Sequence, residues 1–356
     1  MNLVITGGCG FIGTNLVRHA VLGCGHTVTN VDALTYAGNR HSLADLEGRD
    51  DYELVVADIC DAEAMRAVFE RAQPDAVLHL AAESHVDRSI DGPGAFVRTN
   101  IEGTFTLLQV AERYWRSLDD EAASTFRFLH VSTDEVYGSL GPDDPAFTEE
   151  SRYDPHSPYA ASKAASDHLA RAWHDTYGLP VIVTNCSNNY GPYQFPEKLI
   201  PVIVLRALAG ESIPVYGAGD NVRDWLHVED HARALLRVLE AGRPGRTYNI
   251  GGNNEMRNID LVLRVCALLD EVAPAEDGRS YADLVAFVAD RPGHDERYAI
   301  DASKIREELG WTPMPEPDRA LRDTVAWYVE NRSWWESILQ GEYRLERLGL
   351  RDEGAL

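Results

Sequence analysis

The sequence predicts an α/β fold, with a doubly wound parallel sheet and a smaller, discontinuous lobe toward the C-terminus. Short apolar runs typical of buried strands alternate with helical stretches up to about residue 185, which is the pattern of a parallel sheet covered on both faces. The run at 2–6 leads directly into Gly7, Gly10 and Gly13, as a strand does before a nucleotide-binding turn. After residue 185 proline and glycine become frequent and the alternation fades, which indicates a second lobe.

The elements of the sheet follow in chain order. We predict strands at 2–6, 26–31, 52–57, 76–81, 126–131 and 181–184, and helices near 62–72, 96–117 and 158–177. Ligands of such sheets gather outside the carboxyl ends of the strands. Asp58, Ala81, Ala82, Ser132 and Tyr159 are therefore expected at one edge of the sheet.

This reading divides the chain into three parts. Residues 1–185 form a dinucleotide-binding Rossmann domain, to which a segment at about 225–250 returns. Residues 186–330 form a smaller lobe for the second ligand. Residues 331–356 form a peripheral C-terminal tail, in which we find no chemistry.

Three glycines and one aspartate predict the cofactor. Gly7 suits the tight turn, Gly10 lets the backbone approach a pyrophosphate, and Gly13 lets the helix pack on the strand. Asp32 ends the second strand about twenty residues later, where a carboxylate accepts hydrogen bonds from ribose hydroxyls and repels a 2'-phosphate. The pattern therefore favours NAD over NADP, and Arg40 is the nearby cation that could reverse this inference.

A tyrosine and a lysine four residues apart form the first candidate catalytic pair. Tyr159 and Lys163 follow Pro158, which suits the first turn of a helix, so the two side chains share one helix face. The chain has 33 basic residues, of which only Lys163, Lys198 and Lys304 are lysines. Lysine at this position is consistent with a compact ammonium beside a phenol, and its charge, together with that of an oxidised nicotinamide, is expected to lower the pKa of Tyr159.

A second catalytic group follows the central strand. Thr133, Asp134 and Glu135 come directly after the apolar run at 126–131. Side chains alternate between the two faces of a strand, so both carboxylates can reach one substrate only beyond the strand's end. Two adjacent carboxyl groups titrate as a coupled pair, in which one pKa rises. A plain solvated turn is the alternative reading of these three residues, and the nearby Tyr159 and Lys163 argue against it.

Composition excludes several classes of function. The formal charge of -24 and the pI near 4.8 argue against a basic face for nucleic acid or an anionic membrane. The five cysteines are scattered without metal-type spacing, so we expect reduced thiols and no metal site. The strand at 2–6 leaves no room for a signal peptide, and no apolar run approaches membrane-spanning length. A cytoplasmic enzyme is expected.

In this combination the motifs closely resemble those of the extended short-chain dehydrogenase/reductases, and within them the nucleotide-sugar dehydratases. The matching phrases lie at 6–13, 34–39, 81–87, 132–138, 159–163, 185–192, 223–225 and 290–294, so the resemblance covers nearly the whole chain. The adjacent acids Asp134 and Glu135 are the specific feature, because related epimerases lack that pair. Two departures from the family pattern are Cys9, where alanine is commoner, and a shorter stretch at 139–157.

The resemblance implies an NAD-dependent lyase that converts dTDP-glucose to dTDP-4-keto-6-deoxyglucose. Carbon 4 is oxidised, water leaves across carbons 5 and 6, and hydride returns to carbon 6. Tyr159 is expected to take the carbon 4 hydroxyl proton, Lys163 to hold the nicotinamide ribose, and Thr133 to bind the carbon 4 oxygen. Glu135 is expected to act as the base at carbon 5 and Asp134 as the acid at the carbon 6 hydroxyl.

The resemblance also implies the residues that contact each ligand. NAD contacts are expected from Gly7, Gly10, Phe11, Ile12, Gly13, Asp32, Ala33, Leu34, Thr35, Asp58, Ile59, Leu80, Ala81, Ala82, Ser84, Thr99, Tyr159, Lys163 and Asn189. Nucleotide-sugar contacts are expected from Ser84, Thr133, Asn188, Lys198, Leu199, Pro214, Val215, Tyr216, Arg223, Asn258, Asp290, Arg291 and His294. Lys198, Arg223 and Arg291 are the candidate cations for the diphosphate. Family members pair through the helices predicted at 96–117 and 159–177, so a homodimer is expected.

Two alternative functions remain at this stage. An NAD-dependent UDP-sugar 4-epimerase or decarboxylase would use Tyr159 and Lys163 without dehydration, and Asp134 argues against it because those reactions protonate no leaving hydroxyl. A catalytically silent NAD-sensing or scaffold protein of the same fold would not need the intact set of five catalytic side chains. The sequence leaves open the choice of thymidine over uridine, and whether the product serves rhamnose or another deoxysugar.

Overall fold

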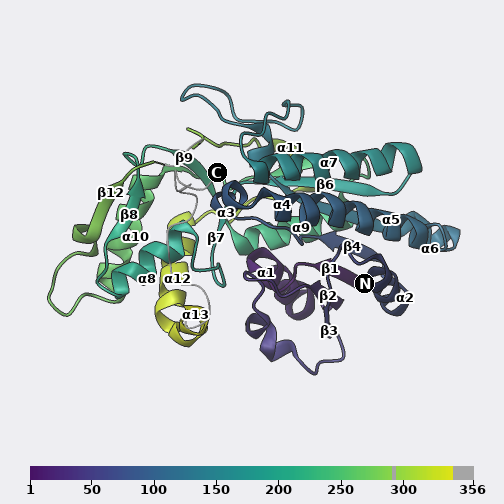
Figure 1. Cartoon of the computed structure of the whole chain (residues 1–356), viewed down its shortest axis with the longest axis horizontal. Helices are drawn as coiled ribbons and strands as arrows, with labels where there is room; N and C mark the ends of the chain where they lie inside the picture. Colours follow the sequence, from purple (N-terminus) through teal and green to yellow (C-terminus); the bar gives the residue numbers. More distant parts are fainter. Residues whose placement is uncertain (291–293, 340–356) are drawn as a thin grey trace.

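The computed structural model describes residues 1–290 and 294–339. Its centre is a seven-stranded sheet in the order β10-β6-β5-β4-β1-β2-β3, with every neighbouring pair parallel. The strands are β1 (Asn2–Thr6), β2 (Thr27–Asp32), β3 (Tyr52–Val56), β4 (Ala76–His79), β5 (Arg127–Thr133), β6 (Val181–Cys186) and β10 (Thr247–Ile250). The predicted doubly wound α/β sheet is confirmed (Figure 1).

Helices cover both faces of this sheet, each with its own buried apolar cluster. One layer consists of α2 (Ala62–Ala72), α5 (Thr104–Trp115) and α7 (Pro158–Tyr177). The other consists of α1 (Phe11–Arg18), α9 (Val228–Ala241) and α11 (Ser303–Leu309). Strands buried on both faces read as continuous apolar runs rather than as alternating ones, which explains why the runs in the sequence located them.

Most predicted strand ends differ from the structure by one or two residues, and one strand and one helix show a physical reason for the difference. Strand β4 ends at His79 rather than at residue 81, because the Ala81 N–H donates to the Thr6 hydroxyl at 3.2 Å instead of continuing the ladder. The helix predicted over 96–117 is divided into α4 (Pro93–Phe96), a π-helical segment at Val97–Gly103 and α5. Propensity patterns do not distinguish a π-helical segment from an α-helix.

The smaller lobe has two short sheets and its own apolar core (Figure 1, left). Its strands are β7 (Asn188–Tyr190), β8 (Ile213–Tyr216), β9 (Val222–His227), β11 (Glu255–Arg257) and β12 (Val285–Val288). Its helices are α8 (Leu199–Leu208), α10 (Asn258–Val272), α12 (Pro317–Glu330) and α13 (Arg332–Leu339). The remaining short segments are π-helical His19–Gly23, α3 (Val86–Asp91), α6 (Asp120–Thr125) and 3₁₀ turns at Arg40–Leu46, Asp134–Tyr137 and Tyr281–Leu284.

The chain passes between the two parts more than once. Helix α9 and strand β10 rejoin the main sheet, within the segment expected to return. Ile305 and Trp311 also pack into the core of the main sheet, although they fall inside the range predicted for the lobe. In the tail, Trp335 packs into the lobe core, and residues 340–356 lie outside the described residues. The three-part division stays a prediction.

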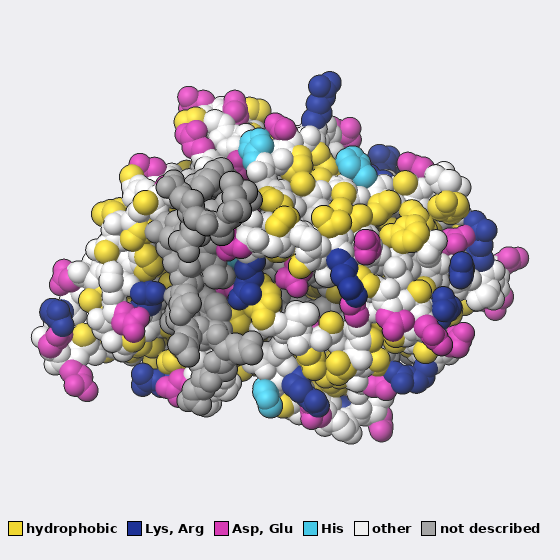
Figure 2. Space-filling model, in the orientation of Figure 1, with side chains coloured by type: hydrophobic (Ala, Val, Ile, Leu, Met, Phe, Trp, Pro, Cys, Tyr) yellow, Lys and Arg dark blue, Asp and Glu magenta, His cyan; other side chains and the backbone are white. Residues whose placement is uncertain are grey.

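The surface carries acidic and basic side chains in mixture, and hydrophobic side chains gather over α5 and α7 (Figure 2). Val97, Phe105 and Tyr177 contribute exposed apolar area there, with exposed fractions of 40–48%. Within residues 1–290 and 294–339, no helix combines the length and apolar character needed to cross a membrane.

Candidate active site

The glycine turn between β1 and α1 leaves no room for side chains. Gly7 has φ +74°, and a methyl group there would lie 2.7 Å from the backbone of Ala81 on the neighbouring strand connection. A methyl group at Gly13 would lie 2.1 Å from the Gly7 carbonyl oxygen. Gly10 precedes the first residue of α1 and lines the adjacent cavity. The turn therefore has the compactness that a pyrophosphate-binding loop requires.

Asp32 is held in place by the backbone on both sides of the cofactor site. Its two carboxylate oxygens accept hydrogen bonds from the Cys9 N–H at 2.9 Å and the Leu34 N–H at 2.8 Å. Burial raises the pKa of this carboxyl, while the two backbone donors act in the opposite direction. Arg40 is paired with Glu47 at 2.9 Å, so its guanidinium is engaged by a carboxylate, which leaves the preference for NAD intact.

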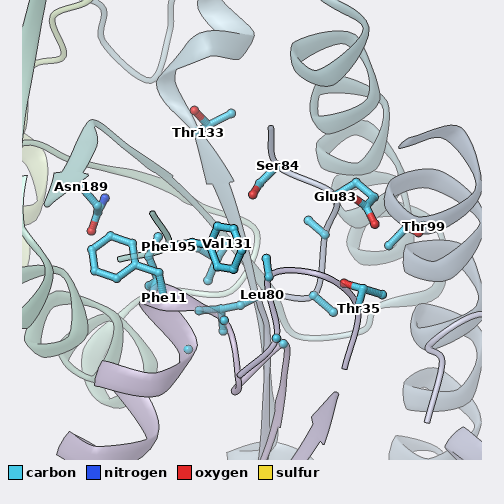
Figure 3. A pocket seen from close by; sticks show the side chains of 18 of the residues that line it. Phe11, Thr35, Leu80, Glu83, Ser84, Thr99, Val131, Thr133, Asn189 and Phe195 are labelled. Carbon is cyan, nitrogen blue, oxygen red and sulfur yellow. The ribbon is translucent and has the colours of Figure 1, made fainter. Parts of the chain in front are cut away.

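One cavity at the carboxyl edge of the main sheet brings the predicted cofactor residues together. Figure 3 shows Phe11, Thr35, Leu80, Ser84 and Thr99 around this space. The predicted cofactor residues that line it are Gly7, Gly10, Phe11, Ile12, Gly13, Asp32, Ala33, Thr35, Asp58, Ile59, Leu80, Ala81, Ala82, Ser84, Thr99, Tyr159, Lys163 and Asn189. Leu34 does not line it and instead contributes its N–H to Asp32.

The five predicted catalytic residues line the same cavity. Strand β5 ends at Thr133, and Asp134 and Glu135 begin the 3₁₀ turn that follows, as predicted. The Thr133 hydroxyl accepts from the Glu135 N–H at 3.3 Å and donates to the Asp134 carboxyl at 3.4 Å. The end of the central strand thus positions a hydroxyl and two carboxyl groups beside the cofactor residues.

Asp134 occupies an environment that favours its protonated form. It is 2% exposed, and one of its oxygens has no hydrogen-bond partner among the described residues. Burial raises its pKa well above the usual value, and the charges of Glu135 and Asp224 act in the same direction. Arg223 opposes this shift. A buried carboxyl next to another carboxylate is suited to donating a proton.

Tyr159 and Lys163 lie in the first turns of α7, whose N-terminus is capped by the Ser157 hydroxyl. Lys163 is 5% exposed, and its ammonium donates to the Val131 carbonyl at 2.9 Å. Burial raises the pKa of Tyr159 well above its usual value, as do Glu135 and Cys186, while Thr133 lowers it. This differs from the expected lowering by Lys163, because burial and nearby negative charge dominate in the protein alone.

The predicted substrate residues fall into two groups. Ser84, Thr133, Asn188 and Lys198 line the cavity. The Lys198 ammonium donates to the Ser84 carbonyl at 3.3 Å, and the Asn188 side-chain oxygen is buried without a partner in the described part of the chain. These residues extend the cavity from the main sheet to the start of the lobe.

The second group lies in the lobe, outside the cavity lining. Tyr216 ends β8, and its ring lies 6.3 Å from the His294 ring. His294 contacts Asp290 at 2.7 Å. The other members are Leu199 at the start of α8, Pro214 and Val215 on β8, Arg223 on β9 and Asn258 at the start of α10.

Arg223 and Asn258, also in this second group, have buried polar atoms. Arg223 donates to the carbonyls of Asp295 and Glu296 at 2.9 and 3.3 Å, and its charge lowers the pKa of Asp134. Asn258 has a buried side-chain oxygen without a partner in residues 1–290 and 294–339. Arg291 was also predicted to bind substrate and lies outside the described residues.

The sequence analysis missed several residues that line the cavity. Cys186 ends β6, and its thiol lies 3.4 Å from the Ser132 carbonyl. Glu197 has a side chain that is 2% exposed and accepts a hydrogen bond from the Tyr36 hydroxyl at 3.2 Å. Arg88 lies over the Tyr36 ring at 3.7 Å. The signal for Glu197 was its position next to Lys198 in the sequence, but its partners come from distant segments.

The residues that the structure describes contain no group of three or more metal-type side chains placed to hold an ion. The chemistry of the cavity is that of a phenol, an ammonium, a hydroxyl and two carboxyl groups. This set can transfer protons to and from a bound substrate. The glycine turn and Asp32 can hold a dinucleotide beside it.

Comparisons with known proteins show the family to which the chain belongs. The family model "GDP-mannose 4,6 dehydratase" matches residues 4–324. The dTDP-glucose 4,6-dehydratase of Shigella flexneri is 58% identical over 352 residues, covering 97% of each chain. The dTDP-glucose 4,6-dehydratase of Neisseria meningitidis is 57% identical over 349 residues, covering 98% of each chain.

Solved structures of dTDP-glucose 4,6-dehydratases are also similar to this chain over nearly its whole length. DesIV, a dTDP-glucose 4,6-dehydratase from Streptomyces venezuelae solved with NAD and TYD bound, has a TM-score of 0.85 and 47% identity, covering 95% of this chain and 100% of DesIV. A UDP-glucose 4-epimerase from Thermotoga maritima has a TM-score of 0.80 but only 28% identity, covering 93% of this chain and 100% of the epimerase. The chain therefore belongs to the GDP-mannose 4,6-dehydratase family, among members similar to the dTDP-glucose 4,6-dehydratases.

Proposed function

We propose that this chain is an NAD-dependent hydro-lyase that converts dTDP-glucose to dTDP-4-keto-6-deoxyglucose and water. The observation that carries the proposal is the pairing, in one cavity, of Tyr159 with the adjacent carboxyl groups of Asp134 and Glu135. An enzyme that only oxidised and reduced carbon 4 would need the phenol but not two acids. The 55–58% identity to dTDP-glucose 4,6-dehydratases supports the same assignment.

NAD is the cofactor that the residues fit. The turn between β1 and α1 has no room for a methyl group at Gly7 or Gly13, and such a compact turn accommodates a pyrophosphate. Asp32 can accept hydrogen bonds from ribose hydroxyls. When bound, NAD supplies the hydride acceptor for carbon 4 and the hydride donor for carbon 6. Lys163, which lines the same cavity, would hold the nicotinamide ribose.

The side chains of this chain would carry the proton transfers. Thr133 binds the carbon 4 oxygen. Tyr159, whose pKa the positive charges of Lys163 and of the bound oxidised nicotinamide would lower, accepts the proton of the carbon 4 hydroxyl as that carbon is oxidised. The new ketone acidifies the hydrogen on carbon 5, which Glu135 removes. Asp134 protonates the carbon 6 hydroxyl, which leaves as water, and Glu135 returns its proton to carbon 5 when carbon 6 is reduced. Tyr159 then gives up the proton that it received and Asp134 regains one by exchange with solvent, which restores the starting protonation states.

The protonation states support these two acid–base roles. A leaving hydroxyl needs a protonated acid, and burial together with Glu135 and Asp224 raises the pKa of Asp134. Glu135 is less buried than Asp134 and can remain the ionised member of the pair. Adjacent carboxyl groups whose environments push their pKa values apart are typical of an acid and a base acting together.

The nucleotide would extend from the cavity into the lobe. Lys198 and Arg223, with Arg291, are proposed to bind the diphosphate. Asn188, Leu199, Pro214, Val215, Tyr216, Asn258, Asp290 and His294 are proposed to contact the rest of the nucleotide. Residues 186–330 would thus act mainly as the substrate lobe, and the main sheet as the cofactor domain.

The chain is also proposed to form a homodimer through α5 and α7, where Val97, Phe105 and Tyr177 are exposed. Light scattering on the purified protein tests this, and a monomer mass would contradict it. A cytoplasmic location stays a prediction from the sequence.

Product analysis tests the proposed function. The purified protein is incubated with dTDP-glucose and, separately, with UDP-glucose, and products are identified by mass spectrometry and NMR. We expect a 4-keto-6-deoxy product from the thymidine substrate. Epimerised or decarboxylated sugar without loss of water would instead support the rival enzyme class, and no reaction with either substrate would support a silent NAD-binding protein.

A further inference from the structure

A fully buried carboxylate lies one helical turn below the catalytic lysine. Asp167 follows Lys163 by four residues on α7 and is 0% exposed. One of its oxygens lies 3.1 Å from His130 Nε2. The other accepts hydrogen bonds from the Tyr153 hydroxyl at 2.8 Å and the Asn185 amide at 3.3 Å. The proposed proton transfers do not use this carboxylate, yet burying a charge is costly unless it is compensated.

Lys163 occupies the same buried layer between α7 and β5. Its ammonium contacts the Val131 carbonyl, and Asp167 contacts His130, the preceding residue of β5. The two side chains therefore share one helix face over neighbouring strand residues. No carboxylate in residues 1–290 and 294–339 forms an ion pair with Lys163 within 4.0 Å, so its charge is compensated at longer range.

The other groups around Asp167 provide little competing positive charge. His130 is fully buried, and burial lowers its pKa, as does Lys163. Its Nδ1 has no partner among the described residues, as suits a neutral imidazole with its hydrogen on Nε2. Arg171 reaches Asp167 only through the Tyr153 hydroxyl, to which it donates at 2.6 Å.

The remaining neighbours are uncharged. Ser166 contacts His130 at 3.2 Å, and Tyr153, Asn185 and Ser132 carry no charge at neutral pH. Burial raises the pKa values of the Tyr153 phenol and the Cys186 thiol, which keeps both neutral. Lys163 and Arg171 lie one turn from Asp167 on either side along α7, and of the two only Lys163 is fully buried.

We propose that Asp167 is a positioning residue of the active site: a negative charge, fixed by His130 and Tyr153, that keeps Lys163 an ammonium ion at the wall of the cavity. Burial lowers the pKa of Lys163, and the charge of Asp167 opposes this. The effect is reciprocal, since Lys163 helps to lower the pKa of Asp167. The inference rests on the proposed function only in taking Lys163 as a group that must be charged.

The small number of lysines allows a direct test. In NMR spectra of protein labelled with ¹³C at the lysine ε-carbon, this chain gives three signals, from Lys163, Lys198 and Lys304. The variants Lys198→Arg and Lys304→Arg each remove one signal and so assign all three. Asp167→Asn is expected to lower the Lys163 titration midpoint by about one to three pKa units. Tyr153→Phe removes a hydrogen bond to Asp167 but no charge, and is expected to leave that midpoint nearly unchanged.

An unchanged Lys163 midpoint in Asp167→Asn would overturn the proposal, and so would an equal shift in Tyr153→Phe. This measurement needs no substrate, so its outcome is separate from that of the dehydratase assay. In the active enzyme, Asp167→Asn should also move the alkaline limb of kcat to lower pH. A purely structural role would lower kcat at every pH instead.

If Asp167→Asn fails to fold, Lys163→Met tests the same coupling from the other side. Burial raises the pKa of Asp167, but the hydrogen bond from His130 and the charge of Lys163 lower it below its usual value. Its contribution to stability is thus present above the unfolded pKa and is lost as pH falls through the folded pKa. In Lys163→Met this acid loss of thermal stability should begin at higher pH, and an unshifted profile would overturn the proposal.

Discussion

Replacing Asp134 by asparagine should separate oxidation from dehydration. The carboxyl is 2% exposed, burial raises its pKa, and one oxygen lacks a partner in the described part of the chain. Asparagine matches the shape and neutrality of the protonated acid but cannot give a proton to the leaving hydroxyl. Loss of a general acid costs about 10²–10⁴ in rate, which corresponds to about 3–5 kcal/mol of transition-state free energy. We expect that loss in kcat, with the reduction of bound NAD by dTDP-glucose retained.

The assay has two readouts. Stopped-flow absorbance follows formation of NADH, and mass spectrometry follows release of the 4-keto-6-deoxy product. A third measurement, exchange of the carbon 5 hydrogen with D₂O, distinguishes the two acids: Asp134→Asn should still exchange it, whereas Glu135→Gln should not. Full turnover in Asp134→Asn, or an equal loss of NADH formation and product, would refute the assignment of Asp134 as the acid.

Three further predictions follow from the site. Tyr159→Phe should slow NADH formation by about 10²–10⁴ in the same stopped-flow assay. Gly13→Ala should abolish NAD binding measured by calorimetry, because its methyl group would lie 2.1 Å from the Gly7 oxygen. The pKa of Asp134 is raised in the folded state, so this group contributes stability at low pH that is lost as pH rises through the folded pKa. The wild type should therefore lose stability relative to Asp134→Asn as pH rises. Thermal unfolding of both proteins at several pH values measures this difference.

Matched controls exist for the first two of these predictions. Tyr177→Phe, at the exposed far end of α7, should leave NADH formation unchanged. Gly94→Ala adds a methyl group where no atom lies within 4 Å and should leave NAD binding intact. The predictions fail if Tyr159→Phe forms NADH at the wild-type rate, if Gly13→Ala binds NAD normally, or if the stability difference for Asp134→Asn is independent of pH.

Much of the fold and of the cavity could be predicted because the signals are local. Strands buried on both faces leave continuous apolar runs, and the glycines of the turn and Asp32 stand at fixed separations along the chain. Thr133 to Glu135 were located at the end of β5 because strand geometry forbids adjacent side chains from sharing a face. The sequence therefore indicated one edge of one sheet as the site.

Other features could not be predicted because they depend on contacts between distant segments. Glu197 meets Tyr36 across 161 residues, and no spacing rule connects them. The raised pKa of Tyr159 results from its burial and from Glu135, which the spacing of Tyr159 and Lys163 does not reveal. The packing of Ile305 against the main sheet likewise follows from a chain crossing rather than from composition.

The two hydrogen bonds to Asp32 have a consequence for protein engineering. The carboxylate proposed to bind the ribose also joins the glycine turn, through Cys9, to the following loop, through Leu34. Exchanging it for a small neutral residue to admit a phosphorylated dinucleotide would leave both N–H groups without their acceptor and release two loops at once. A successful change of coenzyme in this scaffold therefore requires redesign of the loop at 33–39 together with the aspartate.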